Sequence, residues 1–156
     1  MMPDCTSLTL DQHLAPAGAS AESFARLWAG LWRQRRIPPD LLEACRLTFA
    51  RLHDDVGEMA AVNPAVTLSA AAHEAVLAGR TPDDPAYAAA LLFAEYYWLD
   101  AQSITDEAAD AVKAHYGEPG LVLLIEALGL IDGRIRAARC LRDLSTHASS
   151  KEAAHV

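Results

Sequence analysis

Apolar side chains recur every three or four residues through most of the chain, the spacing that places them on one face of an α-helix. The clearest stripe comprises Phe24, Leu27, Trp28, Leu31 and Trp32. It predicts a helix from about residue 20 to the arginine cluster at 33–36, and two prolines at 38–39 mark its end. A second stripe comprises Leu41, Leu42, Cys45, Phe49 and Leu52. It predicts a second helix over 41–52.

The next helices are bounded by residues that start or stop a helix. The segment from Asp55 to Glu58 has the form of a capping box, in which each acid serves a free amide at the other end, and it predicts a short helix. Small residues over 68–77 predict a helix that ends at Gly79, because glycine accepts the left-handed conformation without steric cost. An Asp-Pro pair at 84–85 then opens a helix to about residue 99.

Two further helices complete the pattern. Ser103 or Thr105 caps a helix over about 105–115, and the last helix runs over 119–144. No segment shows the alternation of apolar and polar residues that is typical of a strand, so the sequence predicts an all-α fold of six or seven helices. We expect one helical domain over 20–145, between an irregular, poorly held N-terminal segment (1–19) and a flexible C-terminal tail (146–156).

Composition narrows the class of protein. Apolar residues make up 52% and charged residues 22% of the 156 residues, which is typical of a folding chain and excludes intrinsic disorder. The longest apolar run, residues 86–94, is too short for a membrane span, and the first residues lack the pattern of a secretory signal. We therefore expect a cytoplasmic protein with no membrane partner. A net charge of −8 also disfavours nucleic acid as a partner.

Four segments follow one another in an order that resembles the alkylhydroperoxidase D-like family. They are residues 37–53 (IPPDLLEACRLTFARLH), an Ala-Glu pair at 94–95, an Asp-Glu pair at 106–107 and the stretch 121–134. This family includes the carboxymuconolactone decarboxylases. The resemblance spans roughly residues 24–140. It implies an all-α bundle of about six helices that assembles into trimers or hexamers.

The peroxidases of that family carry a Cys-x-x-Cys-x-x-x-His motif, whose positions fall here on Asp55, Glu58 and Val62. Carboxylates cannot replace a thiolate nucleophile and a resolving thiol, so we do not expect a thiol peroxidase. The decarboxylases resemble this chain in having an acid at the second cysteine position, but their histidine is also missing at Val62. The chain therefore resembles the family in fold and departs from both active-site patterns.

Glu43 is the strongest catalytic candidate, because it lies on a mostly apolar helix and is the active-site residue that the resemblance retains. Asp55, Glu58 and His53 are the residues that could assist it. Each of these residues also has a structural alternative. Glu43 could form an ion pair with an arginine such as Arg46 or Arg134. Asp55 and Glu58 could cap a helix, and His53 could be stabilised by the dipole at a helix C-terminus.

The remaining reactive residue types favour structural roles. The three cysteines include no Cys-x-x-Cys pair and the six histidines include no helical metal-binding pair, so we expect no metal and no cofactor. Cys45 lies on an apolar stripe and is expected to be buried and inert, whereas Cys5 is expected to be exposed. Residues 95–98 (Glu-Tyr-Tyr-Trp) favour a core or subunit interface over the wall of a ligand cavity.

Three functional readings follow. The first is carboxylate acid/base activity on, or binding of, a small organic acid or lactone, with Glu43 as acid or base. The second is a catalytically silent homo-oligomeric scaffold or partner-binding protein. The third, a thiol peroxidase, requires the motif to be out of register and Cys45 to be exposed. Whether an enclosed polar cavity reaches Glu43 discriminates between the first two readings.

Overall fold

The computed structural model describes the backbone of residues 4–153 and the side chains of residues 4–144. This part of the chain contains seven α-helices and no strand, which confirms the all-α prediction. The helices are α1 (Leu10–Leu14), α2 (Ala19–Arg33), α3 (Pro39–Leu52), α4 (Val56–Ala60), α5 (Ala70–Leu77), α6 (Pro85–Asp100) and α7 (Asp106–Ala153). Two short 3₁₀ helices follow α1 and α6, at Ala15–Ala17 and Ala101–Ser103.

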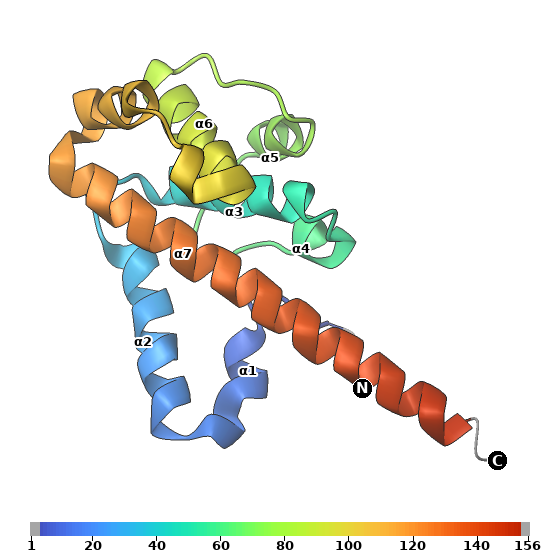
Figure 1. The fold of residues 1–156 in the computed structure, drawn as a ribbon. Helices are drawn as coiled ribbons and strands as arrows, with labels where there is room; N and C mark the ends of the chain where they lie inside the picture. Colours follow the sequence, from blue (N-terminus) through green and yellow to red (C-terminus); the bar gives the residue numbers. More distant parts are fainter. Residues whose placement is uncertain (1–3, 154–156) are drawn as a thin grey trace.

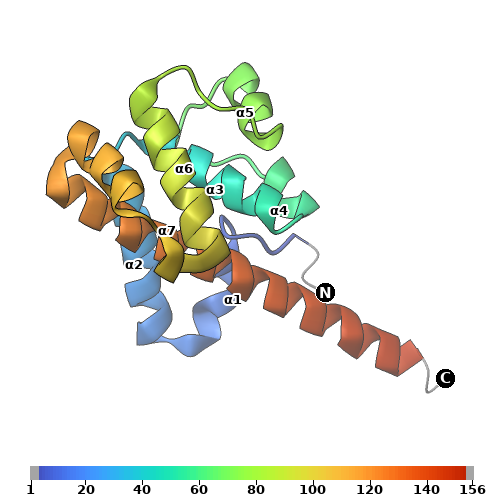
Figure 2. The same cartoon turned by 45° about the horizontal axis from the view of Figure 1, so that its top comes forward.

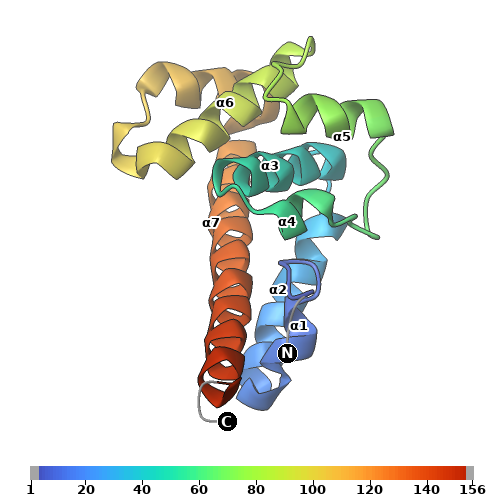
Figure 3. The same ribbon diagram turned by 90° about the vertical axis from the view of Figure 1, so that its right-hand side faces the viewer.

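The long helix α7 organises the others. Helices α1 and α2 lie on one side of it and α3 to α6 on the other (Figure 1). In the view turned by a quarter, α2 runs alongside α7 while α3, α5 and α6 gather near one of its ends (Figure 3). Near its start, α7 is interrupted at Gly117, which has a left-handed φ of 71° and is followed by Pro119. The two helices predicted over 105–115 and 119–144 are therefore both present, joined through this kink.

Helix α3 lies at the centre of the fold, because it packs against α2, α4, α5, α6 and α7 (Figure 2). All of its residues from Leu41 to Ala50 are buried. Leu41, Leu47 and Phe49 contribute to a hydrophobic cluster that also draws residues from α2, α5, α6 and α7. Two charged residues, Glu43 and Arg46, belong to the same buried helix, so the fold must supply them with polar partners.

Side-chain caps start several helices where the sequence predicts them. Asp84 Oδ1 accepts a hydrogen bond from the amide of Ala86 at 2.8 Å, and Thr105 Oγ1, rather than Ser103, accepts one from Ala108 at 3.2 Å. The predicted capping box at α4 forms on one side only. Asp55 caps the helix, but the Glu58 carboxylate bonds elsewhere and the Asp55 amide donates to the carbonyl of Ala50.

The N-terminal segment is held more firmly than predicted. It contains α1, and Cys5, Ser7 and Leu10 are fully buried. Cys5 and Leu10 form a small hydrophobic cluster with Ala138 of α7, so the expectation of an exposed Cys5 was wrong. Residues 1–3 of the segment lie outside the described residues.

The end of the chain also differs from the prediction. Helix α7 continues to Ala153 instead of ending near residue 144, so most of the predicted flexible tail has a helical backbone. Residues 154–156 lie outside the described part of the chain. None of the helices described is both long and apolar enough to cross a lipid bilayer.

Candidate functional site

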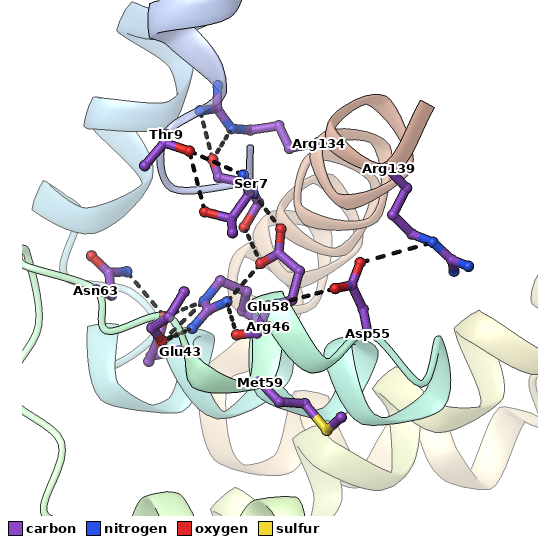
Figure 4. A network of polar contacts seen from close by, with 12 residues as sticks. Ser7, Thr9, Glu43, Arg46, Asp55, Glu58, Met59, Asn63, Arg134 and Arg139 are labelled. Atoms are coloured by element: carbon purple, nitrogen blue, oxygen red, sulfur yellow. Dashed lines mark hydrogen bonds and ion pairs between the residues drawn. The ribbon is translucent and has the colours of Figure 1, made fainter. Parts of the chain in front are cut away.

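Arg46 lies at the centre of a buried polar network that joins α3, α4 and the N-terminal segment (Figure 4). Its side chain is fully buried, and all of its N–H groups are directed at acceptors. Nε and Nη2 donate to the Glu43 carboxylate, and Nη1 donates to the Glu58 carboxylate at 2.8 Å. The carbonyls of Glu58 and Ala61 accept from Nη1 and Nη2 at 3.1 and 2.9 Å. The guanidinium therefore retains no free donor for a ligand.

Glu43 is 2% exposed, and both of its oxygens are occupied. Oε1 accepts from Arg46 Nη2 at 2.7 Å, and Oε2 accepts from Arg46 Nε at 3.0 Å and from Asn63 Nδ2 at 3.0 Å. Asn63 is itself buried in the segment after α4. Of the two arginines that the sequence offered as partners, Glu43 pairs with Arg46 and not with Arg134. Its carboxylate is thus an acceptor within the network rather than a group that faces a cavity.

Glu58 is fully buried and connects α4 to the N-terminal segment. Oε1 accepts a hydrogen bond from the backbone amide of Ser7, and Oε2 accepts one from the Ser7 hydroxyl at 2.8 Å (Figure 4). The same Oε2 receives Nη1 of Arg46. Burying a charged group away from water destabilises the folded state unless the group is ion-paired and hydrogen-bonded. The Glu58 carboxylate meets both conditions.

Arg134 of α7 extends the network beyond Ser7. Its Nε and Nη2 donate to the Ser7 carbonyl at 3.0 and 2.7 Å, and its Nη1 pairs with Asp11 Oδ1 at 2.9 Å. The guanidinium also lies 4.3 Å from the ring centroid of Trp28 and 5.1 Å from that of Phe24. This fully buried arginine thereby anchors the N-terminal segment and α2 to α7.

Asp55 points toward α7 rather than toward Glu43. The preceding Asp54 has a left-handed φ of 52°, which turns the chain between α3 and α4. Asp55 Oδ1 caps α4 by accepting the amide of Glu58 at 3.1 Å, while Oδ2 accepts from Arg142 Nη2 at 2.6 Å. Arg139 lies farther away, with Nε at 3.8 Å from the same Oδ2 (Figure 4). The structural alternative predicted for Asp55, a helix cap, is thus observed.

His53 lies at the C-terminal end of α3 and bonds away from the carboxylate network. Its Nε2 lies 2.7 Å from Asp132 Oδ1 and 3.2 Å from Trp98 Nε1, and its Nδ1 lies 3.2 Å from Arg139 Nη1. The histidine connects α3, α6 and α7 and contacts none of Glu43, Asp55 and Glu58.

Glu43, Asp55 and Glu58 therefore do not share one pocket. Arg46 stands between Glu43 and Glu58, and Asp55 faces the arginines of α7. Among the described residues, no group of three His, Cys, Asp or Glu side chains is placed to hold a metal ion. The aromatic residues at 96–98, which were expected in the core or a subunit interface, pack against the hydrophobic core. Glu95 beside them forms an ion pair with Arg51.

The cysteines offer no redox pair. Cys45 is fully buried, and burial, with a further contribution from the nearby Glu43 charge, raises the pKa of its thiol to about 12. Burial also raises the pKa of Cys5. Cys140 on α7 is exposed. The exposed Cys45 that a thiol peroxidase reading requires is not observed, and the prediction that Cys45 is buried is confirmed.

Sequence reasoning missed Ser7, Asn63 and Arg142 as members of the network. The first lies in a segment with no periodicity, and the others lie far in sequence from the residues they contact. One signal was available, because Arg134 stands between Ile131 and Ile135 on an apolar helix face. A buried arginine there requires acceptors from another segment.

Comparisons with models of protein families, with curated proteins and with solved structures find no match to this chain. The resemblance to the alkylhydroperoxidase D-like family therefore enters the functional argument only as a proposal.

Proposed function

We propose that this chain is a catalytically silent, self-associating binding protein of the alkylhydroperoxidase D-like family. The observation that carries this proposal is the saturation of Glu43 and Glu58 by Arg46, Asn63 and Ser7. A general acid or base must be within hydrogen-bond reach of its substrate. Carboxylates that are almost inaccessible to solvent and fully occupied by internal donors are suited to holding helices together instead.

The surface that we propose for self-association is the groove between α2 and α7. Leu27, which is 54% exposed, and Leu123 and Leu130 line this groove. Arg26 on α2 and Glu126 on α7 lie at its two sides, and both are exposed. In a two-fold contact between identical chains, Arg26 of one copy meets Glu126 of the other, and the reverse pair forms as well. This charge complementarity favours a second copy of the chain as the occupant.

Light scattering coupled to size-exclusion chromatography tests self-association. The wild-type chain is expected to elute with a mass that is a multiple of 16.8 kDa. Leu27→Asp should shift it to the monomer mass, because the substitution places a charge in an apolar contact. Leu99→Asp is the matched control, since Leu99 is 67% exposed and lies on α6, outside this groove. A wild-type monomer, or equal dissociation of both variants, contradicts the proposed interface.

A further inference from the structure

A cavity of about 280 Å³, separate from the groove between α2 and α7, lies between α3, the C-terminal end of α5 and the middle of α6. Helix α3 packs against both α5 and α6 (Figure 2). Val76, Pro82, Leu91 and Leu92 provide apolar walls. Ligand cavities commonly combine such walls with a few polar groups and have volumes of roughly 300–1,000 Å³. The volume of this cavity lies just below that range, which fits a small ligand.

Arg51 of α3 supplies the first polar group in this cavity. Its Nη2 donates to Glu95 Oε1 of α6 at 3.0 Å, and its side chain is 28% exposed. Its Nε is shielded from solvent and has no hydrogen-bond partner among the described residues. A shielded donor without an acceptor costs about 1–3 kcal/mol. The Arg51 side chain as a whole is partly exposed and lines the cavity, so its guanidinium can still donate to an additional acceptor there.

The end of α5 places a second arginine beside the first. Gly79 has a φ of 71° and closes the helix with two hydrogen bonds, from its own amide to Val76 and from the amide of Arg80 to Ala75. A Cβ at Gly79 would lie only 3.4 Å from two guanidinium atoms of Arg51, so the glycine allows this close approach. The exposed Arg80 follows directly, and its side chain has no ion pair with any described residue.

We propose that this cavity binds a small organic anion, with its carboxylate on Arg51 and Arg80 and its apolar body against α5 and α6. Two arginines and one glutamate leave a single positive charge to be neutralised, which matches a monocarboxylate. Arginine is suited to this ligand because its planar fork matches the two oxygens of a carboxylate. The site uses none of the buried network residues and goes beyond the proposed function.

The test is a titration of the full-length protein with benzoate, followed by backbone amide shifts in NMR. Benzoate is expected to bind and to shift the signals of residues that line the cavity, whereas benzamide, its neutral analogue, and acetate, which lacks an apolar body, should bind more weakly. Arg51→Gln and Arg80→Gln should each weaken benzoate binding roughly tenfold, as expected for the loss of a hydrogen bond to a charged group.

Glu95→Gln provides the sharpest discrimination, because removing the competing carboxylate should tighten benzoate binding. If the Arg51–Glu95 pair were purely structural, Arg51→Gln and Glu95→Gln would not change benzoate affinity in opposite directions. Arg36→Gln is the charge-matched control, since Arg36 is exposed and lies outside the cavity. If Arg51→Gln fails to fold, Arg80→Gln and Glu95→Gln still decide the question.

Three results overturn the inference: no benzoate-induced shifts at the cavity, equal affinities for benzoate and benzamide, or equal benzoate affinities in the wild type and in the folded variants. Each can occur whether or not the chain self-associates through α2 and α7. The benzoate titration and the mass measurement therefore succeed or fail separately.

Discussion

Arg46 and Glu58, on neighbouring helices, form an ion pair at 2.8 Å in which neither side chain is exposed. The pair would be costly by itself, because both charges lose their hydration. Glu43, Asn63, Ser7 and two backbone carbonyls supply the remaining hydrogen bonds. The network therefore acts as a unit. Loss of one member leaves the remaining charged groups buried without a partner, which destabilises the folded state.

Arg46→Met should destabilise the fold strongly, since it leaves two carboxylates buried without a cation. We expect the free energy of unfolding, measured by urea denaturation, to fall by about 3–5 kcal/mol. Arg46→Lys should also lose stability, because one ammonium group cannot reproduce the planar set of donors. Arg36→Met, at an exposed position, should change stability by no more than about 0.5 kcal/mol. Similar effects at positions 46 and 36 would contradict the network's structural role.

Arg134→Leu should loosen the N-terminal segment, because the Ser7 carbonyl and Asp11 lose their donors. Hydrogen exchange followed by mass spectrometry is expected to show faster exchange in peptides covering residues 4–14. Arg136→Leu is the control on the same helix, since the Arg136 side chain is 61% exposed and pairs with Asp132 rather than with the N-terminal segment. Unchanged exchange in Arg134→Leu would mean that other contacts hold the segment.

Only Cys140 should react with iodoacetamide in the native protein, because Cys5 and Cys45 are buried. Mass spectrometry of the labelled chain is expected to find one modified cysteine, and three after unfolding in urea. The raised pKa of Cys45 also makes stability depend on pH. Its contribution is complete below pH 9 and is lost as the pH rises from about 9 toward about 12, since the unfolded thiol ionises first. Rapid native labelling of Cys45 would revive the peroxidase reading.

Two glycine substitutions should have opposite effects on thermal stability. Gly79→Ala is expected to lower the free energy of unfolding by about 1 kcal/mol or more, because alanine is strained at a φ of 71° and crowds Arg51. Gly133→Ala should raise it by about 0.5–1 kcal/mol, because this helical glycine has open space around it. Calorimetric melting of both variants checks whether each change in stability has the expected direction. Stabilisation by Gly79→Ala would contradict the claim that alanine is strained at this turn.

The helix pattern could be read from the sequence because local signals determine it. The stripe from Phe24 to Trp32 and the caps at Asp84 and Thr105 each act within a few residues. Helix α1 was missed because its five residues are too few to show a periodic face. The end of α7 was misplaced because the small polar residues beyond Leu144 carry no strong stop signal.

The partners in the network could not be read in the same way. The sequence identified Glu43, Asp55 and Glu58 as notable acids, but it could not show which arginine each one faces. Glu43 pairs locally with Arg46, three positions away, while Asp55 pairs with Arg142 on a distant helix. The spacing of Asp55 and Glu58 predicted a reciprocal capping box, yet tertiary donors on Arg46 and Ser7 took the Glu58 carboxylate. Distant charged donors outweighed one local amide.

The contact between Ser7 and Arg134 joins positions 127 residues apart. During synthesis Cys5 and Ser7 leave the ribosome before Arg134 and Arg142 are made. The carbonyls of Cys5 and Ser7 therefore stay in water until α7 is complete. Cys5 and Ser7 consequently reach their native contacts only after α7 is made, and a ribosome that stalls before α7 leaves them unattached.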